Sequence, residues 1–104
     1  MKLVADQANI LRLEGELDFA SAVAVRPELE KRLDAASSVM TLDLSGLTRV
    51  NSVGLSLILV AARRLEQQGG SLVIRGVPEG LQSMAAVYGL DQWLNSIAAP
   101  SAAG

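Results

Sequence analysis

The spacing of the apolar residues constrains the fold of this chain more than any other feature, because it switches between two periods. From Ile10 to Asp18 apolar and charged residues alternate, which predicts a strand with one buried face and one face in water. From Ser21 to Ala36 apolar residues recur every three or four positions, which predicts an amphipathic helix. The sequence therefore predicts a domain in which strands and helices alternate along the chain.

Further segments extend this alternation to about residue 94. A short strand over 3–5 precedes the first one and pairs with it as a hairpin through a turn at 6–9. The remaining predicted elements are strands over 39–44 and 71–75, helices over 53–68 and 78–89, and a last turn over 90–94. Strand-helix-strand units favour parallel strands joined by right-handed crossovers. The expected fold class is α/β, with a small mixed β-sheet and helices packed mainly on one face.

Proline and glycine set the expected ends of the first two helices. Pro27 lies inside the first helical pattern, and because proline has no N–H and clashes with the preceding turn, we expect the regular helix to start near it after an irregular turn. Gly69 and Gly70 are expected to stop the second helix in a left-handed conformation. The buried positions predicted for the first helix are Ala22, Val25, Leu29, Leu33 and Ala36.

The composition argues against several classes of function. The chain contains no histidine and no cysteine, so the commonest general base, metal ligand and thiol nucleophile are all missing. Nine basic and eleven acidic residues are scattered along the sequence, and there is one Phe, one Tyr and one Trp, so neither a basic stripe nor a stacking platform for nucleic acid is evident. We expect no cofactor, no bound metal, no nucleic-acid partner and no catalytic activity.

Length and apolar runs indicate one domain without a membrane segment. A chain of 104 residues with 50% hydrophobic side chains is large enough to bury one core. We expect that domain over residues 1–97, followed by a disordered C-terminal tail over 98–104. The longest uncharged run, Val50 to Ala62, is shorter than the about 20 apolar residues that span a bilayer. The expected location is the cytoplasm, without direct membrane insertion.

Three short motifs occur in an order that resembles the STAS domain family. They are Gly15-Glu16-Leu17-Asp18, Asp43-Leu44-Ser45 and Asn51-Ser52-Val53-Gly54-Leu55. The first two close predicted strands, and the third opens the long apolar helix. The resemblance covers about residues 10–94 and implies the STAS fold. It also implies a non-catalytic protein-interaction domain, with a partner-binding or regulatory surface formed by Asn51, Ser52, Val53, Gly54, Leu55 and Asp18.

Within this family the chain looks more like MlaB-like subunits than like sporulation-type antagonists. The residues that carry this resemblance are Arg49-Val50-Asn51-Ser52, Leu55-Ser56-Leu57-Ile58-Leu59 and the segment from Gly70 to Pro78. It implies a subunit that binds and supports the ATPase of a phospholipid-transporting ABC complex, which maintains outer-membrane lipid asymmetry. The protein would then be peripheral on the inner membrane through its protein partner.

The resemblance also leaves open an anti-sigma factor antagonist, which binds an anti-sigma factor kinase. In that branch of the family the hydroxyl residue of an Asp-Ser/Thr-x-Gly-Leu turn is phosphorylated, and the matching residue here is Ser52. Asn51 stands in the place of the aspartate that helps to tune the phosphorylation site. This departure favours a constitutive docking element over a phosphorylation switch.

The residues of the turn also have structural interpretations. Asn51 or Ser52 at a helix entry can accept a hydrogen bond from an unpaired backbone N–H as an N-cap, and capping does not exclude a contact role. Asp18 and Asp43 both end predicted strands, and the family resemblance implies that these strand ends lie near this turn, where each carboxylate can bond to loop N–H groups. A small enzyme acting through Asp18 or Asp43 with Ser52 is a third hypothesis, and the lack of a base for the serine argues against it.

The second predicted helix is more apolar than one buried stripe requires. Its apolar residues occupy too many directions for a single face, so some of them contact another layer or another protein. Two interpretations remain open, a helix wedged deeply against the sheet or a docking patch around its first turn.

Overall fold

The computed structural model describes residues 2–7, 9–35 and 38–99, and in it strands and helices alternate as the sequence predicts. The strands are β1 (Lys2–Gln7), β2 (Ile10–Leu17), β3 (Val39–Val50) and β4 (Ser71–Arg75). The helices are α1 (Phe19–Asp34), α2 (Ser52–Gln67), α3 (Glu79–Val87) and α4 (Asp91–Ile97). The strand order is β1-β2-β3-β4, with β1 antiparallel to β2 and the other neighbouring pairs parallel. The predicted mixed sheet is confirmed.

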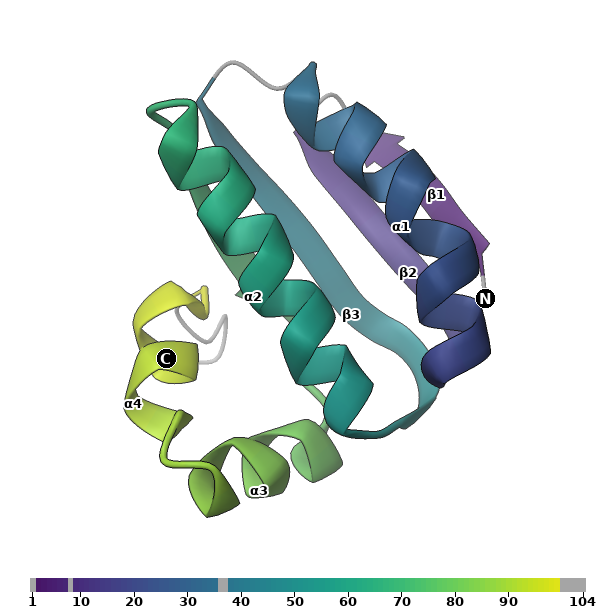
Figure 1. The fold of residues 1–104 in the computed structure, drawn as a ribbon, viewed down its shortest axis with the longest axis vertical. Helices are drawn as coiled ribbons and strands as arrows, with labels where there is room; N and C mark the ends of the chain where they lie inside the picture. Colours follow the sequence, from purple (N-terminus) through teal and green to yellow (C-terminus); the bar gives the residue numbers. More distant parts are fainter. Residues whose placement is uncertain (1, 8, 36–37, 100–104) are drawn as a thin grey trace.

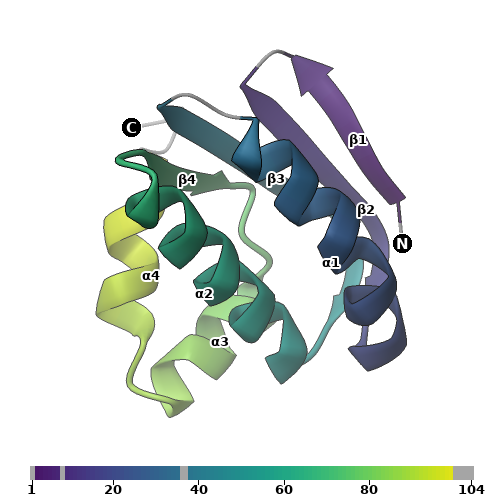
Figure 2. The same cartoon turned by 45° about the horizontal axis from the view of Figure 1, so that its top comes forward.

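The helices form a layer on one face of the sheet. Figure 1 shows α1 and α2 side by side in front of the strands, with α3 and α4 next to α2 on the side away from α1. Figure 2 shows the same arrangement from a second direction. Because side chains alternate along a strand, every second residue of β2, β3 and β4 points into this layer. The largest fully buried strand residues are Leu13, Leu17, Leu42, Leu44 and Ile74.

Helix α1 begins at Phe19, so the expected start near Pro27 was wrong. The Ser21 N–H donates to Asp18 Oδ1 at 2.9 Å, and the Asp18 N–H donates to Ser21 Oγ at 2.9 Å. This capping box satisfies N–H groups of the first turn and starts the helix well before the proline. Pro27 lies on the exposed side, where water can reach the Val23 carbonyl that loses its N–H donor. The residues predicted to be buried, Ala22, Val25, Leu29 and Leu33, are buried, whereas Ala36 lies outside the described residues.

Strand β3 continues to Val50, although the sequence predicted a loop after Leu44. Its second half pairs with β2 across two register shifts, as far as the pair Leu17 and Val50. The Ser, Gly and Thr residues in this segment suggest a loop, but pairing with a neighbouring strand outweighs that local preference. Asp43 therefore lies in the middle of a strand, roughly 25 Å along the extended chain from Asn51.

Gly69 and Gly70 follow the end of α2, and Ala98 pairs with β4. Gly69 has a φ of 80°, and a Cβ at Gly70 would lie 2.1 Å from the Ser38 carbonyl oxygen, so the predicted helix stop is confirmed. Ala98 forms a parallel bridge with Ile74 at the edge of β4, within the stretch 98–104 that was expected to be a tail. The rest of that expected tail, 100–104, lies outside the described residues. In the described part of the chain, no helix has the length and apolar character needed to span a membrane.

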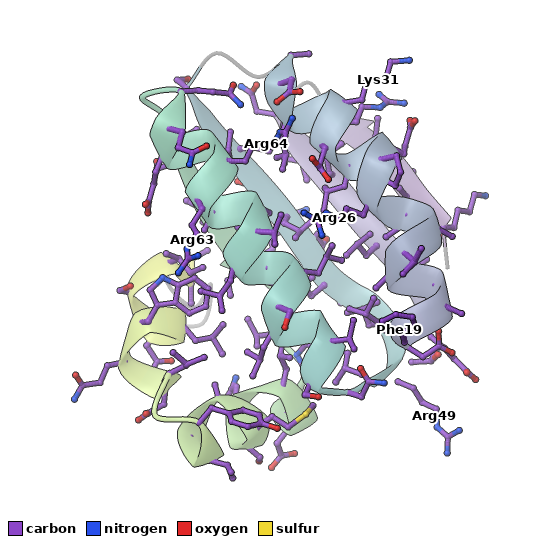
Figure 3. The ribbon with its side chains drawn as sticks, viewed as in Figure 1. Phe19, Arg26, Lys31, Arg49, Arg63 and Arg64 are labelled. Atoms are coloured by element: carbon purple, nitrogen blue, oxygen red, sulfur yellow. The ribbon has the colours of Figure 1, made fainter. Side chains whose placement is uncertain are left out.

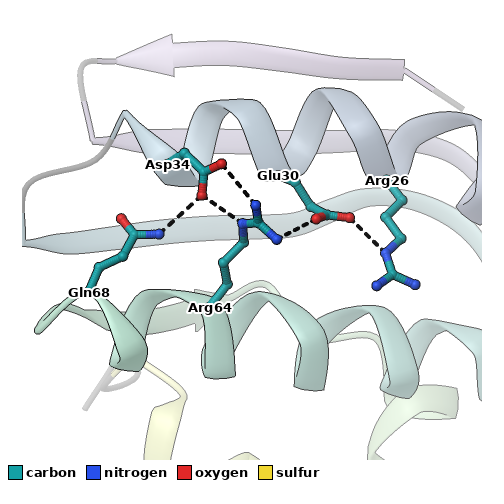
Figure 4. Close-up of polar contacts among 5 residues, drawn as sticks. All are labelled: Arg26, Glu30, Asp34, Arg64 and Gln68. Carbon is teal, nitrogen blue, oxygen red and sulfur yellow. Dashed lines mark hydrogen bonds and ion pairs between the residues drawn. The ribbon is translucent and has the colours of Figure 1, made fainter.

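A cluster of charged side chains, the Arg64 cluster, joins the C-terminal halves of α1 and α2 (Figure 4). Arg64 donates from Nε to Asp34 Oδ1 at 2.6 Å and from Nη2 to Asp34 Oδ2 at 2.9 Å, and its Nη1 donates to Glu30. Gln68 adds a bond to Asp34 at 3.2 Å, and Arg26 Nε donates to Glu30 at 2.7 Å. The bidentate pairing attracts the two helices to each other, and its geometry also fixes their register.

Acid should weaken this cluster. Hydrogen bonds from Arg64 lower the pKa of Asp34 below its ordinary value of 3.8. Because the folded-state pKa is the lower one, the stabilisation is complete above the ordinary pKa and is lost as pH falls through the folded-state value. We expect the difference in unfolding free energy between wild type and Asp34→Asn to stay constant from about pH 7 to about pH 5 and to shrink below about pH 4.

Urea unfolding of both proteins across this pH range measures the effect. Asp34 and Arg64 both reach water, so about 1 M salt should reduce the difference at neutral pH. A difference that is the same at about pH 3 as at about pH 7 would contradict the assignment of this ion pair.

Candidate functional site

The turn between β3 and α2 exposes Ser52 at the first position of the helix. Asn51 has an extended backbone, with φ −134° and ψ −171°, and its Oδ1 accepts a hydrogen bond from the Val53 N–H at 3.0 Å. Asn51 is therefore the N-cap, the role that the sequence left open between Asn51 and Ser52. The Ser52 hydroxyl is exposed and makes no hydrogen bond within the described residues. Its side chain is thus available for contact with another molecule.

The electrostatic surroundings of this turn are mixed, because the start of α2 and Arg49 are positive whereas Glu16 and Asp18 line the adjoining hollow. The first turn of α2 contains no acidic residue, and a helix N-terminus carries a partial positive charge. Arg49 precedes the turn, and Figure 3 shows its side chain projecting away from the molecule. It forms no ion pair with any residue that the structure describes.

Asp18 lies beside the turn, as the family resemblance implied. It lines a shallow hollow together with Leu17, Arg49 and Asn51. Its carboxylate is engaged in the capping box of α1, where a hydrogen bond from the Ser21 backbone N–H, followed by one from the Ser21 side chain, lowers the pKa of Asp18. The carboxylate therefore remains charged at neutral pH and acts as a helix cap at the rim of the turn.

Two of the predicted site residues face inward. Leu55 is 3% exposed and belongs to the core. Gly54 is also buried, and a Cβ at this position would lie 3.1 Å from Leu17 Cδ2 and 3.5 Å from Leu81 Cδ1. These residues position the turn from inside, whereas Asn51, Ser52 and part of Val53 form its outer surface.

Asp43 does not lie at this turn, contrary to what the family resemblance implied. It is 6% exposed and accepts hydrogen bonds from Ser45 N at 2.9 Å, Ser45 Oγ at 2.7 Å and Arg75 Nη2 at 3.2 Å. Burial raises the pKa of Asp43, but the bonds from Ser45 and then from Arg75 outweigh burial and leave the pKa below its ordinary value. Asp43 thus contributes to strand packing, and its bond to a backbone N–H is the part of the expectation that is confirmed.

Apolar hollows flank the first turns of α2 on both sides. One hollow, which we call the α1–α2 groove, has a volume of about 250 Å³ and is lined by Phe19, Ala22, Val23, Arg26, Val53, Ser56, Leu57 and Val60. The other, which we call the α3-side hollow, has a volume of about 370 Å³ and is lined by Ser52, Val53, Leu55, Ser56, Tyr88 and Leu90. The exposed part of α2 is therefore a ridge between two depressions.

Sequence reasoning missed the exposed apolar residues of α1. Phe19 is 70% exposed and Val23 is 58% exposed, and both line the α1–α2 groove. Across the ridge, Tyr88 is 59% exposed in the α3-side hollow. Single exposed apolar residues are ordinary, but several around one feature mark an interaction surface. Their signal in the sequence was that Phe19 and Val23 fall outside the predicted buried face of α1. Among the described residues, no cluster of three or more carboxylates could hold a metal ion.

The sequence of this chain is similar to a family model and to several known proteins. A family model described as Mlab, STAS domain matches residues 4–97. The intermembrane phospholipid transport system binding protein MlaB of Escherichia coli (strain K12) is 32% identical over 82 residues, which cover 79% of this chain and 81% of that protein. The putative anti-sigma factor antagonist BtrV of Bordetella bronchiseptica is 34% identical over 77 residues, covering 71% of this chain and 66% of that protein.

Solved structures agree with the fold. The anti-sigma factor antagonist SpoIIAA in its unphosphorylated form superimposes with a TM-score of 0.71 at 21% identity, covering 96% of this chain and 88% of that one. The family model spans nearly the whole sequence, and the MlaB protein exceeds 30% identity over most of it. This chain therefore belongs to the STAS domain family, in the group that the MlaB model describes.

Proposed function

We propose that this chain is a non-catalytic subunit that docks on the ATPase of a phospholipid-transporting ABC complex and supports its activity, in a system that maintains outer-membrane lipid asymmetry. The observation that carries the proposal is the exposed ridge at the start of α2, where Ser52 and Val53 lie between two apolar hollows. The MlaB relative is named as the binding protein of an intermembrane phospholipid transport system, which supports the choice of partner.

The chemistry around Ser52 favours binding over catalysis. A serine nucleophile needs a base within hydrogen-bond reach, and this sequence has no histidine to serve as one. The carboxylate of Asp18, which lies by the same turn, is already held by Ser21. A surface without an activated nucleophile but with exposed apolar groups is suited to a protein partner.

A second candidate is an anti-sigma factor antagonist that binds an anti-sigma kinase. It is favoured by the BtrV relative and by the unbonded Ser52 hydroxyl, which a kinase can reach at the first position of the helix. We rank it second because Asn51 caps α2 as a neutral side chain, so the turn lacks the carboxylate that the antagonist branch carries beside its phosphorylation site.

Affinity purification of the tagged chain from its own source cell, followed by mass spectrometry, distinguishes the candidates. We expect an ABC ATPase and its permease at stoichiometric abundance, and a membrane fraction that contains the chain only while that ATPase is present. Recovery of an anti-sigma kinase with no ABC ATPase would contradict the first proposal in favour of the second. Deleting the gene of the ATPase provides the matched control for membrane association.

A further inference from the structure

The length and volume of the α1–α2 groove suit side chains that a partner helix presents. The groove runs along two turns of each flanking helix, from Phe19 to Arg26 on α1 and from Val53 to Val60 on α2, or about 10 Å of helix length. Its volume of about 250 Å³ is below the about 300–1,000 Å³ of typical small-molecule sites. It is therefore better suited to one or two apolar side chains of another protein than to an enclosed ligand.

No carboxylate lines the groove itself, although Asp18 directly precedes Phe19 and Glu30 bonds to Arg26. No aspartate or glutamate occurs from Phe19 to Pro27 or from Ser52 to Leu65, although the whole chain has a net charge of −2. The charged side chain that lines the groove is that of Arg26. An acidic protein thus presents a groove whose apolar walls are free of carboxylates.

Arg26 retains hydrogen-bonding capacity toward a partner. Its Nε donates to Glu30 at 2.7 Å, and this is the one hydrogen bond of its guanidinium among the described residues. A guanidinium carries five N–H donors, so four remain. Figure 4 shows the two Nη groups pointing away from Glu30, and Figure 3 places the side chain between α1 and α2. Arg26 shares Glu30 with Arg64, whose other partner is Asp34, so what Arg26 offers a partner carboxylate is its unused N–H donors.

From this placement we propose that an amphipathic helix of the partner ATPase lies in the α1–α2 groove, with an apolar side chain against Phe19 and Val23 and a carboxylate that pairs with Arg26. The inference rests on the proposed function and extends its contact surface. Val53 and Ser56 line the groove and also the α3-side hollow, so the two depressions meet at the ridge. A helix in the groove therefore continues the contact made at Ser52. The i, i+4 spacing of the helix places its anchor and its carboxylate on one face.

Two opposite charges at one position test both parts of the inference. The experiment measures the affinity of the purified ATPase subunit of the same source cell for wild type, Val23→Glu and Val23→Lys, at about 0.15 M salt. We expect Val23→Glu to weaken binding at least about tenfold, because it removes the apolar contact and repels the partner's carboxylate. Val23→Lys should bind several-fold more tightly than Val23→Glu. Glutamate and lysine have similar helix propensities, and Arg26 at i+3 favours the glutamate only slightly, so the thermal unfolding of the two variants should differ little.

Ala24→Glu is the matched control, because Ala24 is exposed on the same helix but does not line the groove. We expect its affinity to stay within about twofold of wild type. If glutamate and lysine at position 23 weaken binding equally, the partner has no carboxylate beside Arg26. If neither variant changes the affinity, the α1–α2 groove is not part of the docking surface. If Ser52→Asp weakens binding while both Val23 variants do not, the docking function stands and this inference fails. If the wild-type chain does not bind the ATPase at all, the proposed function fails with it.

Discussion

Replacing Ser52 with aspartate should weaken partner binding severely without loss of stability. An aspartate at the first position of α2 meets the positive end of the helix, which stabilises a fold by about 0.3–1 kcal/mol. The same charge buried at an interface without a partner costs about 2–5 kcal/mol, or at least about thirtyfold in affinity. The variant should therefore melt at the wild-type temperature or above it and fail to bind the ATPase. Calorimetry on the variant and titration with the purified ATPase measure the two effects.

Ser52→Ala is the control for this experiment. Asn51 supplies the capping hydrogen bond, so removal of the Ser52 hydroxyl leaves the helix start intact. We expect its affinity to change by about fivefold or less, because a single neutral hydrogen bond contributes about 1 kcal/mol. Wild-type affinity in the aspartate variant would show that the ridge at the start of α2 is not the docking surface. A large loss of stability in that variant would instead contradict the position of Ser52 at the helix terminus.

Enlarging Gly54 to valine should have the largest effect on folding. A Cβ at this position already lies 3.1 Å from Leu17 Cδ2, and a valine adds two methyl groups in a space bounded by Leu17 and Leu81. Overpacking a core in this way costs about 1–3 kcal/mol, and the fully buried neighbours put the expected loss at about 2–3 kcal/mol. Urea unfolding of the variant measures this loss. Binding to the ATPase should weaken as well, because Gly54 sets the position of the docking turn.

Gly54→Ala separates packing from helix propensity. Alanine gains about 1 kcal/mol over glycine inside a helix, whereas its single methyl group needs only a small shift of the flexible end of Leu17. These terms nearly cancel, so we expect a stability change within about 1 kcal/mol. A Gly54→Val variant that is as stable as wild type would contradict the close approach of α2 to β2.

Local sequence patterns predicted most of the fold, because the spacing of apolar residues within a segment indicates which of its faces is buried. The spacing of Ala22, Val25, Leu29 and Leu33 identified the buried face of α1, since helical periodicity decides which side meets the sheet. The start of α1 was not predicted correctly, because Pro27 gave a strong local signal and the reciprocal bonds of Asp18 and Ser21 gave a weak one. The length of β3 was missed for a related reason: its second half is held by pairing with β2, which lies outside the segment itself.

The candidate site was predicted in its centre and missed at its edges. Asn51 and Ser52 follow a recognisable helix-entry pattern, so their place at the start of α2 could be inferred from the sequence. The groove beside them forms only when α1 and α2 pack together, and Phe19 and Val23 acquire a role through that contact. The pairing of Arg64 with Asp34 joins residues 30 positions apart, which no local pattern reveals. This part of the surface is formed by tertiary packing, so local sequence patterns could not predict it.

Site-specific photo-crosslinking in the source cell tests the docking surface most directly. A photoreactive phenylalanine replaces Ser56, an exposed residue that lines both hollows, and in a control strain it replaces Val39, an exposed residue at the end of β3 opposite to the start of α2. We predict a crosslink from position 56 to the ATPase of the phospholipid-transport complex and none from position 39. A crosslink from position 56 to an anti-sigma kinase, or crosslinks to the ATPase from position 39 alone, would contradict the proposed docking of this chain through the start of α2.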